Sequence, residues 1–219
     1  MDTRLLFCFA VLTGVQHGEV RAEHVRWEIA DGGNGHWYEV FQGPTDSYFN
    51  GVQRVINWPE AQLNAQAQGG YLATVTSSEE NEFVFSLTDS PSNWQTDGIG
   101  NYFGAWLGAF QEPETQDPTA GWQWITGEPF AFANWHPGEP NDLFGQIDEN
   151  RIAFFASESS TGQRSAFWND EQATRLIVTA YVVEYVPEPT SLAVALASLF
   201  ACSQFRLSVM NQIGERGIK

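Results

Sequence analysis

The central part of this 219-residue chain lacks cysteine. The two cysteines, Cys8 and Cys202, lie in apolar stretches near the two ends of the sequence. A disulfide framework needs paired cysteines, and a thiolate zinc site needs several of them together. Both are therefore excluded for the body of the protein.

Basic residues are scarce, and lysine is absent before Lys219. The chain has 27 acidic and 10 basic residues, a formal net charge of −17, and residues 23–189 hold 24 of the acids but only 5 of the bases. Without a basic patch to neutralise phosphates, binding to nucleic acid or to an anionic membrane is disfavoured. Composition alone fits a cation-binding surface and acidity that only maintains solubility equally well.

Long apolar runs are also missing, but a short one lies near the N-terminus. The run 5–12 follows Arg4 and precedes Val20-Arg21-Ala22, whose small residues suit a signal peptidase. The run is too short to cross a bilayer. The pattern predicts a signal peptide at residues 1–22 and export of the remainder.

The C-terminal segment has a recognisable pattern of its own. Val186-Pro187-Glu188-Pro189 precedes an apolar stretch at 192–200, and Arg206 follows. This resembles the PEP-CTERM sorting tail of Gram-negative bacteria, with a shorter apolar run and fewer basic residues than that family has. For residues 187–219 the resemblance implies removal by an exosortase, transient membrane contact, and delivery to the cell surface or extracellular matrix. A proline-rich linker followed by a terminal helix is the alternative.

Two helix starts can be read from capping residues. Asn57 precedes Trp58-Pro59-Glu60, with proline in the first turn, and Gly69-Gly70 follows as a stop signal. Ser77 precedes Ser78-Glu79-Glu80 in a second capping box. The stripes expected to be buried are, in order, Trp58, Ala61 and Ala65, then Phe83, Val84 and Leu87.

Strands are expected where aromatic and β-branched residues cluster, at 36–41, 71–75, 105–110, 122–125, 151–155 and 179–185. Residues 31–35 are rich in turn formers, so 23–35 is expected to be an N-terminal linker and 36–186 the folded domain. Residues 126–150 form a long loop dense in Gly, Pro, Asn and acids, and loops of that length are usually functional or disordered. Two early helices followed by strands indicate an α+β fold.

Three segments offer oxygen ligands in the loop-rich half: Glu139-Pro140-Asn141-Asp142, Asp148-Glu149-Asn150 and Asn169-Asp170. Calcium takes six to eight oxygens from carboxylates and carbonyls, whereas zinc and copper prefer His and Cys. Spacing alone does not show that these residues converge. A solvated acidic loop is the alternative.

A resemblance to a known family covers the chain from Trp58 to Tyr185. The motifs that carry it occur in the family's order: Trp58-Pro59-Glu60-Ala61, Gly69-Gly70-Tyr71-Leu72-Ala73, Ser78-Glu79-Glu80-Asn81, Ala105-Trp106-Leu107-Gly108, Trp124-Ile125-Thr126-Gly127-Glu128-Pro129, Asn134-Trp135, Glu139-Pro140-Asn141-Asp142, Glu149-Asn150, Trp168-Asn169-Asp170 and Tyr181-Val182-Val183-Glu184. Together they resemble a bacterial C-type lectin-like domain. The resemblance implies two helices, two small antiparallel sheets, a long ligand-binding loop and, here, no disulfides.

The resemblance also implies a calcium site. Carried over by position, the metal ligands are Glu139, Asn141, Glu149, Asn169 and Asp170, and a cis peptide bond precedes Pro140. In the family two adjacent sugar hydroxyls complete the calcium shell, and the sugar-binding residues are Glu139, Asn141, Glu149 and Asn169. Glu-Pro-Asn is the family's signature for mannose-, fucose- and glucose-type sugars, whereas Gln-Pro-Asp favours galactose.

The sequence departs from the family pattern in three respects. The four family cysteines fall on Ala65 and Val183, expected to form an apolar contact, and on Arg151 and Ala173, where Arg151 is expected to pair with an acid. The loop before Glu149 is two residues longer than in vertebrate mannose-type members, which leaves Asp148 as an alternative ligand. One acid of the family's secondary metal site falls on Gln111, and the candidates for that site are Glu112, Glu114, Asp142 and Asn150.

The leading hypothesis is therefore calcium-dependent carbohydrate binding, for instance to an exopolysaccharide, by an exported surface or matrix protein. The alternative is an adhesive or structural matrix protein that binds protein through the same scaffold, since fold alone does not fix function. No catalytic constellation stands out, so an enzyme is not expected. Trp135 and Trp168 are expected in the core, and His136 as a structural loop residue rather than a ligand.

Overall fold

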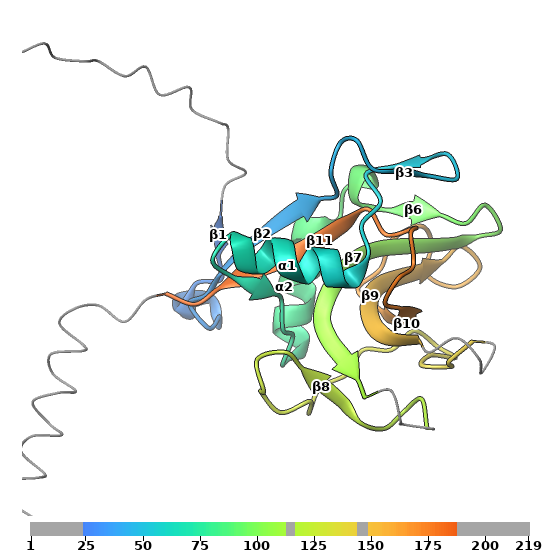
Figure 1. Cartoon of the computed structure of the whole chain (residues 1–219). Coiled ribbons are helices and arrows are strands. Elements are labelled where there is room, and N and C mark those ends of the chain that lie inside the picture. The colour runs from blue at the N-terminus through green and yellow to red at the C-terminus, as the bar shows by residue number, and fades with distance from the viewer. Residues whose placement is uncertain (1–23, 113–116, 144–148, 188–219) are drawn as a thin grey trace, which may run out of the picture.

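The computed structural model describes residues 24–112, 117–143 and 149–187 (Figure 1). The elements in chain order are β1 (Val25–Arg26), a 3-10 helix (Ile29–Asp31), β2 (Trp37–Gln42), β3 (Tyr48–Phe49), β4 (Val52–Gln53), α1 (Trp58–Ala67), β5 (Tyr71–Leu72), α2 (Ser78–Thr88), a second 3-10 helix (Pro91–Asn93), β6 (Gln95–Thr96), β7 (Asn101–Gln111), β8 (Trp122–Trp124), β9 (Glu149–Ser157), β10 (Trp168–Gln172) and β11 (Ala180–Tyr185). The expected signal peptide at 1–22 and the sorting tail beyond Pro187 lie outside the described residues. None of the helices in the described part is both long and apolar enough to span a bilayer.

Both helices begin at the capping residues that the sequence indicates. The Asn57 side chain accepts a hydrogen bond from the Glu60 amide at 2.9 Å, and Ser77 Oγ accepts one from the Glu80 amide at 3.1 Å. The Glu80 carboxylate does not complete a capping box with Ser77. It turns inward instead, where it accepts hydrogen bonds from the Thr76 amide and the Tyr38 hydroxyl. The start of α2 is thereby tied to β2.

The sheet forms a single hydrogen-bonded network rather than two separate small sheets. Its main path runs β1-β2-β11-β7-β9-β10, with β5, β6 and β8 paired at its sides, and β3-β4 forms a separate hairpin. A parallel pairing of Tyr181 with Trp106 joins β11 to β7 and so connects the two halves. The α+β class with two helices is confirmed; only the separation into two sheets differs.

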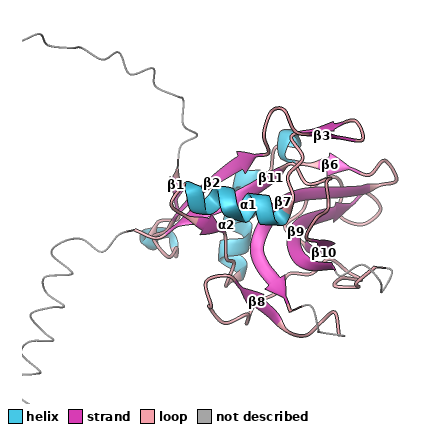
Figure 2. Ribbon diagram, viewed as in Figure 1, coloured by secondary structure: helices cyan, strands magenta, loops and turns pink. Residues whose placement is uncertain are grey.

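Alternating residues divide the core between the two faces of this sheet. On β11, Ala180 and Val182 belong to one buried cluster, while Tyr181 and Val183 belong to the other. The first cluster includes Val84 of α2, and the second includes Trp58, Ala61 and Ala65 of α1. The two helices therefore cover opposite faces, with α1 crossing in front of the sheet in Figure 2.

Packing takes the place of the missing disulfides. Ala65 and Val183 are fully buried in the same cluster, as expected. Arg151, for which an acidic partner was expected, lies with its guanidinium 4.5 Å from the centre of the Trp58 ring and 5.8 Å from that of Phe110. This stack links β9 to the start of α1, where the Trp58 amide also donates to the Ala173 carbonyl at 3.0 Å.

The segment expected to be a linker is part of the domain. β1 pairs with β2, and the His24 Nε2 atom lies 2.7 Å from the Glu39 carboxylate. His36 Nδ1 lies 2.6 Å from Glu184, whose side chain is 1% exposed. The turn formers at 31–35 reverse the chain between β1 and β2, a hairpin-like role that composition alone did not distinguish from a linker.

The contact between His36 and Glu184 predicts a pH-dependent contribution to stability. The hydrogen bond to Glu184 raises the pKa of His36 above its usual value, against the opposing effect of burial. Stability from this pair is present below the unfolded-state pKa of histidine and is lost as the pH rises through the raised folded-state pKa. His36→Gln should therefore lower the unfolding free energy by about 1–2 kcal/mol at pH 5.5 and by less at pH 9.

Urea denaturation at the two pH values measures this difference. Equal losses at pH 5.5 and pH 9 would show that the imidazolium does not stabilise the fold. The exposed Gln68→Ala variant, at the end of α1, provides a control for general effects of pH.

Candidate functional site

The loop that carries Glu139-Pro140-Asn141 is fastened alongside β10. The Trp168 amide donates to the Asn134 carbonyl at 2.9 Å, and the His136 amide donates to the Trp168 carbonyl at 2.8 Å. Trp168 is fully buried, and its indole N–H donates to Asn81 of α2 at 2.8 Å. The core thus fixes the strand end from which Asn169 and Asp170 follow.

A tight turn then brings the motif against Asp170. The Glu139 amide donates to the His136 carbonyl at 2.9 Å, and the Glu139–Pro140 peptide bond is cis, as expected. The Asn141 amide donates to both oxygens of the Asp170 carboxylate at 3.1 Å, and the Asp142 amide donates to Oδ2 at 2.8 Å. Two segments about thirty residues apart are thereby joined through one buried carboxylate.

Glu149 closes the loop from the other side. Its carboxylate accepts a hydrogen bond from the Leu143 amide at 2.6 Å, and its own amide donates to Asp142 Oδ1 at 3.3 Å. The side chain is 6% exposed. Asp148, the alternative ligand, lies outside the described residues.

Asn169 introduces a residue that sequence reasoning missed. Its amide nitrogen donates to the Asp170 carbonyl at 2.7 Å and to Glu171 Oε1 at 3.2 Å. Glu171 is 1% exposed, and its Oε2 lies 3.7 Å from Arg175 Nε. The sequence offered one indication of a role for Glu171, which is its position directly after Asn169-Asp170.

Burial, and at some positions the charge of a neighbouring carboxylate, raises the pKa values of the acids at this site. Burial, followed by the nearby charge of Asp170, raises the pKa of Glu139, and burial likewise raises that of Asp170 against its backbone hydrogen bonds. Burial and the charge of Glu171 raise the pKa of Glu149 to about 8. Burial raises that of Glu171 to about 7, with Arg175 acting in the opposite direction. The site therefore favours either protons or a cation.

The donor set fits a hard, oxygen-preferring cation. One buried oxygen of Glu139, Oε2, has no hydrogen-bond partner among the described residues, and the neighbouring ligand types are carboxylate and amide oxygens. Over the same part of the chain, no three side chains of His, Cys, Asp or Glu group closely enough to enclose a metal by themselves. Two of the five expected ligands, Asn141 and Asn169, are amides and do not enter that grouping.

The expected secondary metal set is not assembled in the same way. Asp142 is engaged with the Glu149 amide, Asn150 is buried, and Glu112 is exposed just after β7. Glu114 lies outside the described residues. These contacts do not define a second site.

The neighbouring aromatic residues serve the core. Trp135 packs edge-on against Trp168, with ring centres 5.8 Å apart, and both belong to the cluster under the loop. His136 is buried, its Nε2 lies 2.9 Å from Ser160 Oγ, and its ring meets Phe155 edge-on. These contacts agree with the core positions expected of the two tryptophans and with a structural role for His136 in the loop.

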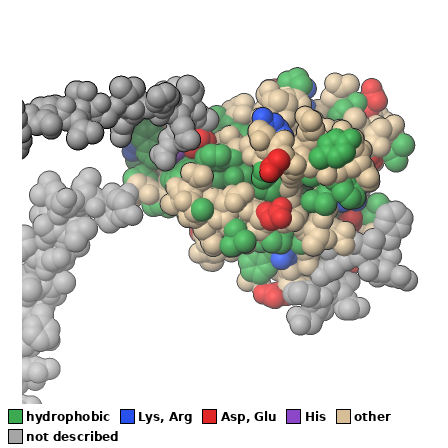
Figure 3. Space-filling model, turned by 45° about the horizontal axis from the view of Figure 1, so that its top comes forward, with side chains coloured by type: hydrophobic (Ala, Val, Ile, Leu, Met, Phe, Trp, Pro, Cys, Tyr) green, Lys and Arg blue, Asp and Glu red, His purple; other side chains and the backbone are tan. Residues whose placement is uncertain are grey.

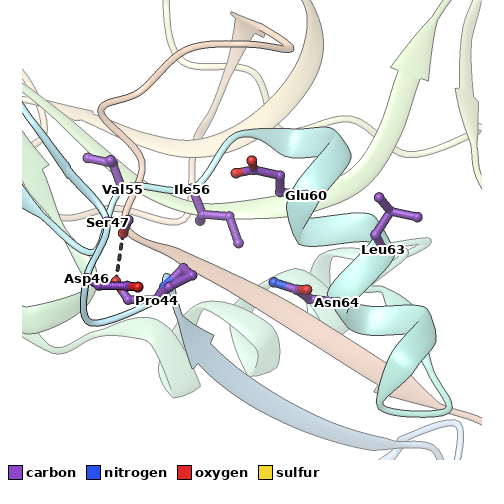
Figure 4. Close-up of a pocket in the computed structure, with 8 residues that line it drawn as sticks. All are labelled: Pro44, Asp46, Ser47, Val55, Ile56, Glu60, Leu63 and Asn64. Carbon is purple, nitrogen blue, oxygen red and sulfur yellow. Dashed lines mark hydrogen bonds between the residues drawn. The ribbon is translucent and has the colours of Figure 1, made fainter.

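One hollow of about 450 Å³ lies between α1 and the segments before it, and is lined by Glu60, Leu63 and Asn64 of α1 together with Pro44 and Val55 (Figure 4). It shares no residue with the loop site. On the face shown in Figure 3, Lys and Arg side chains are few and separated rather than gathered into a patch.

The α+β architecture and the cis Glu-Pro turn docked on β10 define a C-type lectin-like domain. The model of the lectin C-type domain matches residues 54–175. Perlucin-like protein of Mytilus galloprovincialis is 31% identical over 87 residues, 39% of this chain and 49% of that protein. Ladderlectin of Oncorhynchus mykiss is 32% identical over 95 residues, 43% of this chain and 44% of that protein.

A solved structure of the cow C-type carbohydrate-recognition domain of CD23, determined in the presence of a GlcNAc2Man3 oligosaccharide, aligns with a TM-score of 0.48 at 18% identity. The alignment covers 70% of this chain and 89% of that one. The chain matches about half or less of the length of the two relatives. Because the domain model matches more than half of its 219 residues, the chain belongs to the C-type lectin domain family.

The carboxylate cluster predicts an unusual pH response in the presence of EDTA. A raised folded-state pKa means that the folded state holds its proton more tightly, so stability present at low pH is lost as the pH rises through that pKa. In EDTA, the melting temperature should therefore fall between pH 5 and pH 9, and Glu139→Gln should flatten this fall.

With millimolar calcium in place of EDTA, wild type should regain stability at pH 8 and Glu139→Gln should gain less. Differential scanning calorimetry measures both effects. Wild-type and variant profiles that coincide in EDTA would contradict the raised pKa of Glu139. The exposed Glu60→Gln variant controls for the loss of one surface charge.

Proposed function

We propose that this protein binds calcium at Glu139, Asn141, Glu149, Asn169 and Asp170, and through it a carbohydrate of the mannose, fucose or glucose type. The observation that carries the proposal is the docking of the Glu139-Pro140-Asn141 turn on Asp170 through two backbone amides. This contact supports the proposal because it joins the turn to a carboxylate about thirty residues further along the chain. Membership of the C-type lectin domain family agrees with it.

Bound calcium would supply a positive charge that offsets the carboxylates and takes lone pairs from two sugar hydroxyls. The chain's own groups would do the rest. Glu139 and Glu149 accept hydrogen bonds from those hydroxyls, while the Asn141 amide donates to them. Asn169, the fourth expected sugar-binding residue, has its N–H groups bonded to the Asp170 carbonyl and to Glu171, so its proposed part is to give its oxygen to the cation. An adjacent pair of equatorial hydroxyls suits this arrangement, following the family preference attached to Glu-Pro-Asn.

Binding rather than catalysis is the proposed role. The raised pKa values of Glu139 and Glu149 are accounted for by burial and by neighbouring carboxylates. The two end segments are the basis for proposing export and delivery to the cell surface or matrix. An exopolysaccharide would be accessible to the protein there. Single lectin sites are usually weak, so display of many copies on a surface would provide avidity.

The calcium and sugar roles can be tested separately by calorimetry. Titration of calcium into wild-type protein should show one site that Glu139→Ala and Asp170→Ala abolish, because each removes a carboxylate from the donor set. The control is Asp46→Ala, an acid on the distant hollow in Figure 4. If neither site variant alters calcium binding, the ligand assignment is wrong.

With calcium bound, mannose or fucose should give heat that galactose does not, and EDTA should remove it. Calcium binding without heat from any of these sugars would favour the alternative role, an adhesive domain that binds protein.

The end segments can be tested by mass spectrometry of the protein from its native host. The expected mature form starts at Glu23 and lacks the apolar stretch at 192–200. Recovery of the full-length chain from the cell surface would contradict processing at both ends.

A further inference from the structure

Glu171 is a buried carboxylate beside the proposed ligands. It is 1% exposed and lies on β10 directly after Asp170. A buried charge costs free energy unless partners satisfy it. Arg175 Nε lies 3.7 Å from Glu171 Oε2, a distance that offsets charge but is too long for a hydrogen bond. Its carboxylate accepts a hydrogen bond from the Asn169 side-chain amide at 3.2 Å, and the Gln172 backbone also hydrogen-bonds to it.

That contact determines how the Asn169 amide is turned. A side-chain amide has two N–H hydrogens. The nitrogen of Asn169 donates to the Asp170 carbonyl at 2.7 Å and to Glu171 Oε1 at 3.2 Å, so both hydrogens are engaged within the strand. Because the nitrogen is held toward the Asp170 carbonyl and Glu171, the amide oxygen points away from these two groups.

We propose that Glu171 is a positioning residue that presents the Asn169 oxygen to the bound cation. The proposal rests on the calcium role of Asn169 given above and adds a residue that acts on the ion through Asn169. Groups that orient metal ligands typically change metal affinity 10- to 100-fold when they are replaced. Glu171 fits that description because it is buried, charged, and bonded to a ligand rather than to solvent.

Arg175 completes the arrangement. Its guanidinium lies 5.2 Å from the centre of the Phe103 ring, which holds it near Glu171 while the side chain stays 37% exposed. This cation reduces the repulsion between Glu171 and the neighbouring Asp170. An ionised carboxylate is a stronger acceptor for the Asn169 amide than a neutral group would be.

A double-mutant cycle separates positioning from simple attraction between Glu171 and the cation. Calcium alone is titrated into wild type, Glu171→Gln, Asn169→Ala and the double variant. If Glu171 acts through Asn169, Glu171→Gln should weaken calcium binding about 10-fold in wild type and hardly at all beside Asn169→Ala. Equal losses in both backgrounds would show that only the charge of Glu171 matters and would overturn the proposal.

Glu60→Gln, on the exposed side of α1, removes the same charge away from the site and should leave calcium affinity unchanged. If wild type binds no calcium, the proposed function itself fails, and the role of Glu171 toward the cation fails with it. If wild type binds calcium but the losses of affinity in the two single variants add up in the double variant, only the positioning role of Glu171 is contradicted.

A spectroscopic readout in EDTA tests the contact without any metal. In wild type the side-chain amide protons of Asn169 should exchange slowly and lie away from the free-asparagine position, because both are hydrogen-bonded. Glu171→Gln should speed their exchange. Amide protons of Asn169 that exchange as fast as those of an exposed asparagine such as Asn50 would overturn the proposal, even if Glu171→Gln were poorly folded.

Discussion

The candidate site depends on one carboxylate, that of Asp170. It accepts hydrogen bonds from the amides of Asn141 and Asp142, and so holds a long loop to the end strand of the sheet. A charged acceptor at backbone amides makes stronger bonds than a neutral one, and each is shielded because Asp170 is fully buried. Loss of these bonds would free the loop and separate the ligand segments at the same time.

The strand that carries Asp170 is itself fixed by the core rather than by cysteines. Trp168 is buried among aromatic rings and bonded to Asn81, so α2 positions β10. On the other face of the sheet, the stack of Arg151 on Trp58 joins β9 to the start of α1. A cation–π contact of this kind contributes on the order of 1–2 kcal/mol, less than a disulfide typically does. Packing over both faces therefore has to provide the remainder, which the paired core clusters supply.

The helix starts and the strands rich in aromatic and β-branched residues could be predicted from the sequence because capping and periodicity are local signals. The cis bond before Pro140 followed from family resemblance. Three features could not be predicted. β1 is two residues long and holds through pairing with β2, the Glu80 side chain turns to Tyr38 instead of Ser77, and Arg151 meets aromatic rings. Each depends on a partner distant in sequence, which no local pattern contains.

The same reasoning explains why Glu171 escaped notice in the sequence. Residues two apart in a strand lie next to each other on one side, which brings Asn169 and Glu171 into contact. The family motif contains the proposed ligands Asn169 and Asp170 but ends before Glu171, which bonds to Asn169. Asp170 secures the loop to β10 through the amides of Asn141 and Asp142, and Glu171 orients Asn169. A single five-residue strand thus combines an aromatic anchor in Trp168, two proposed ligands and the residue that aligns one of them.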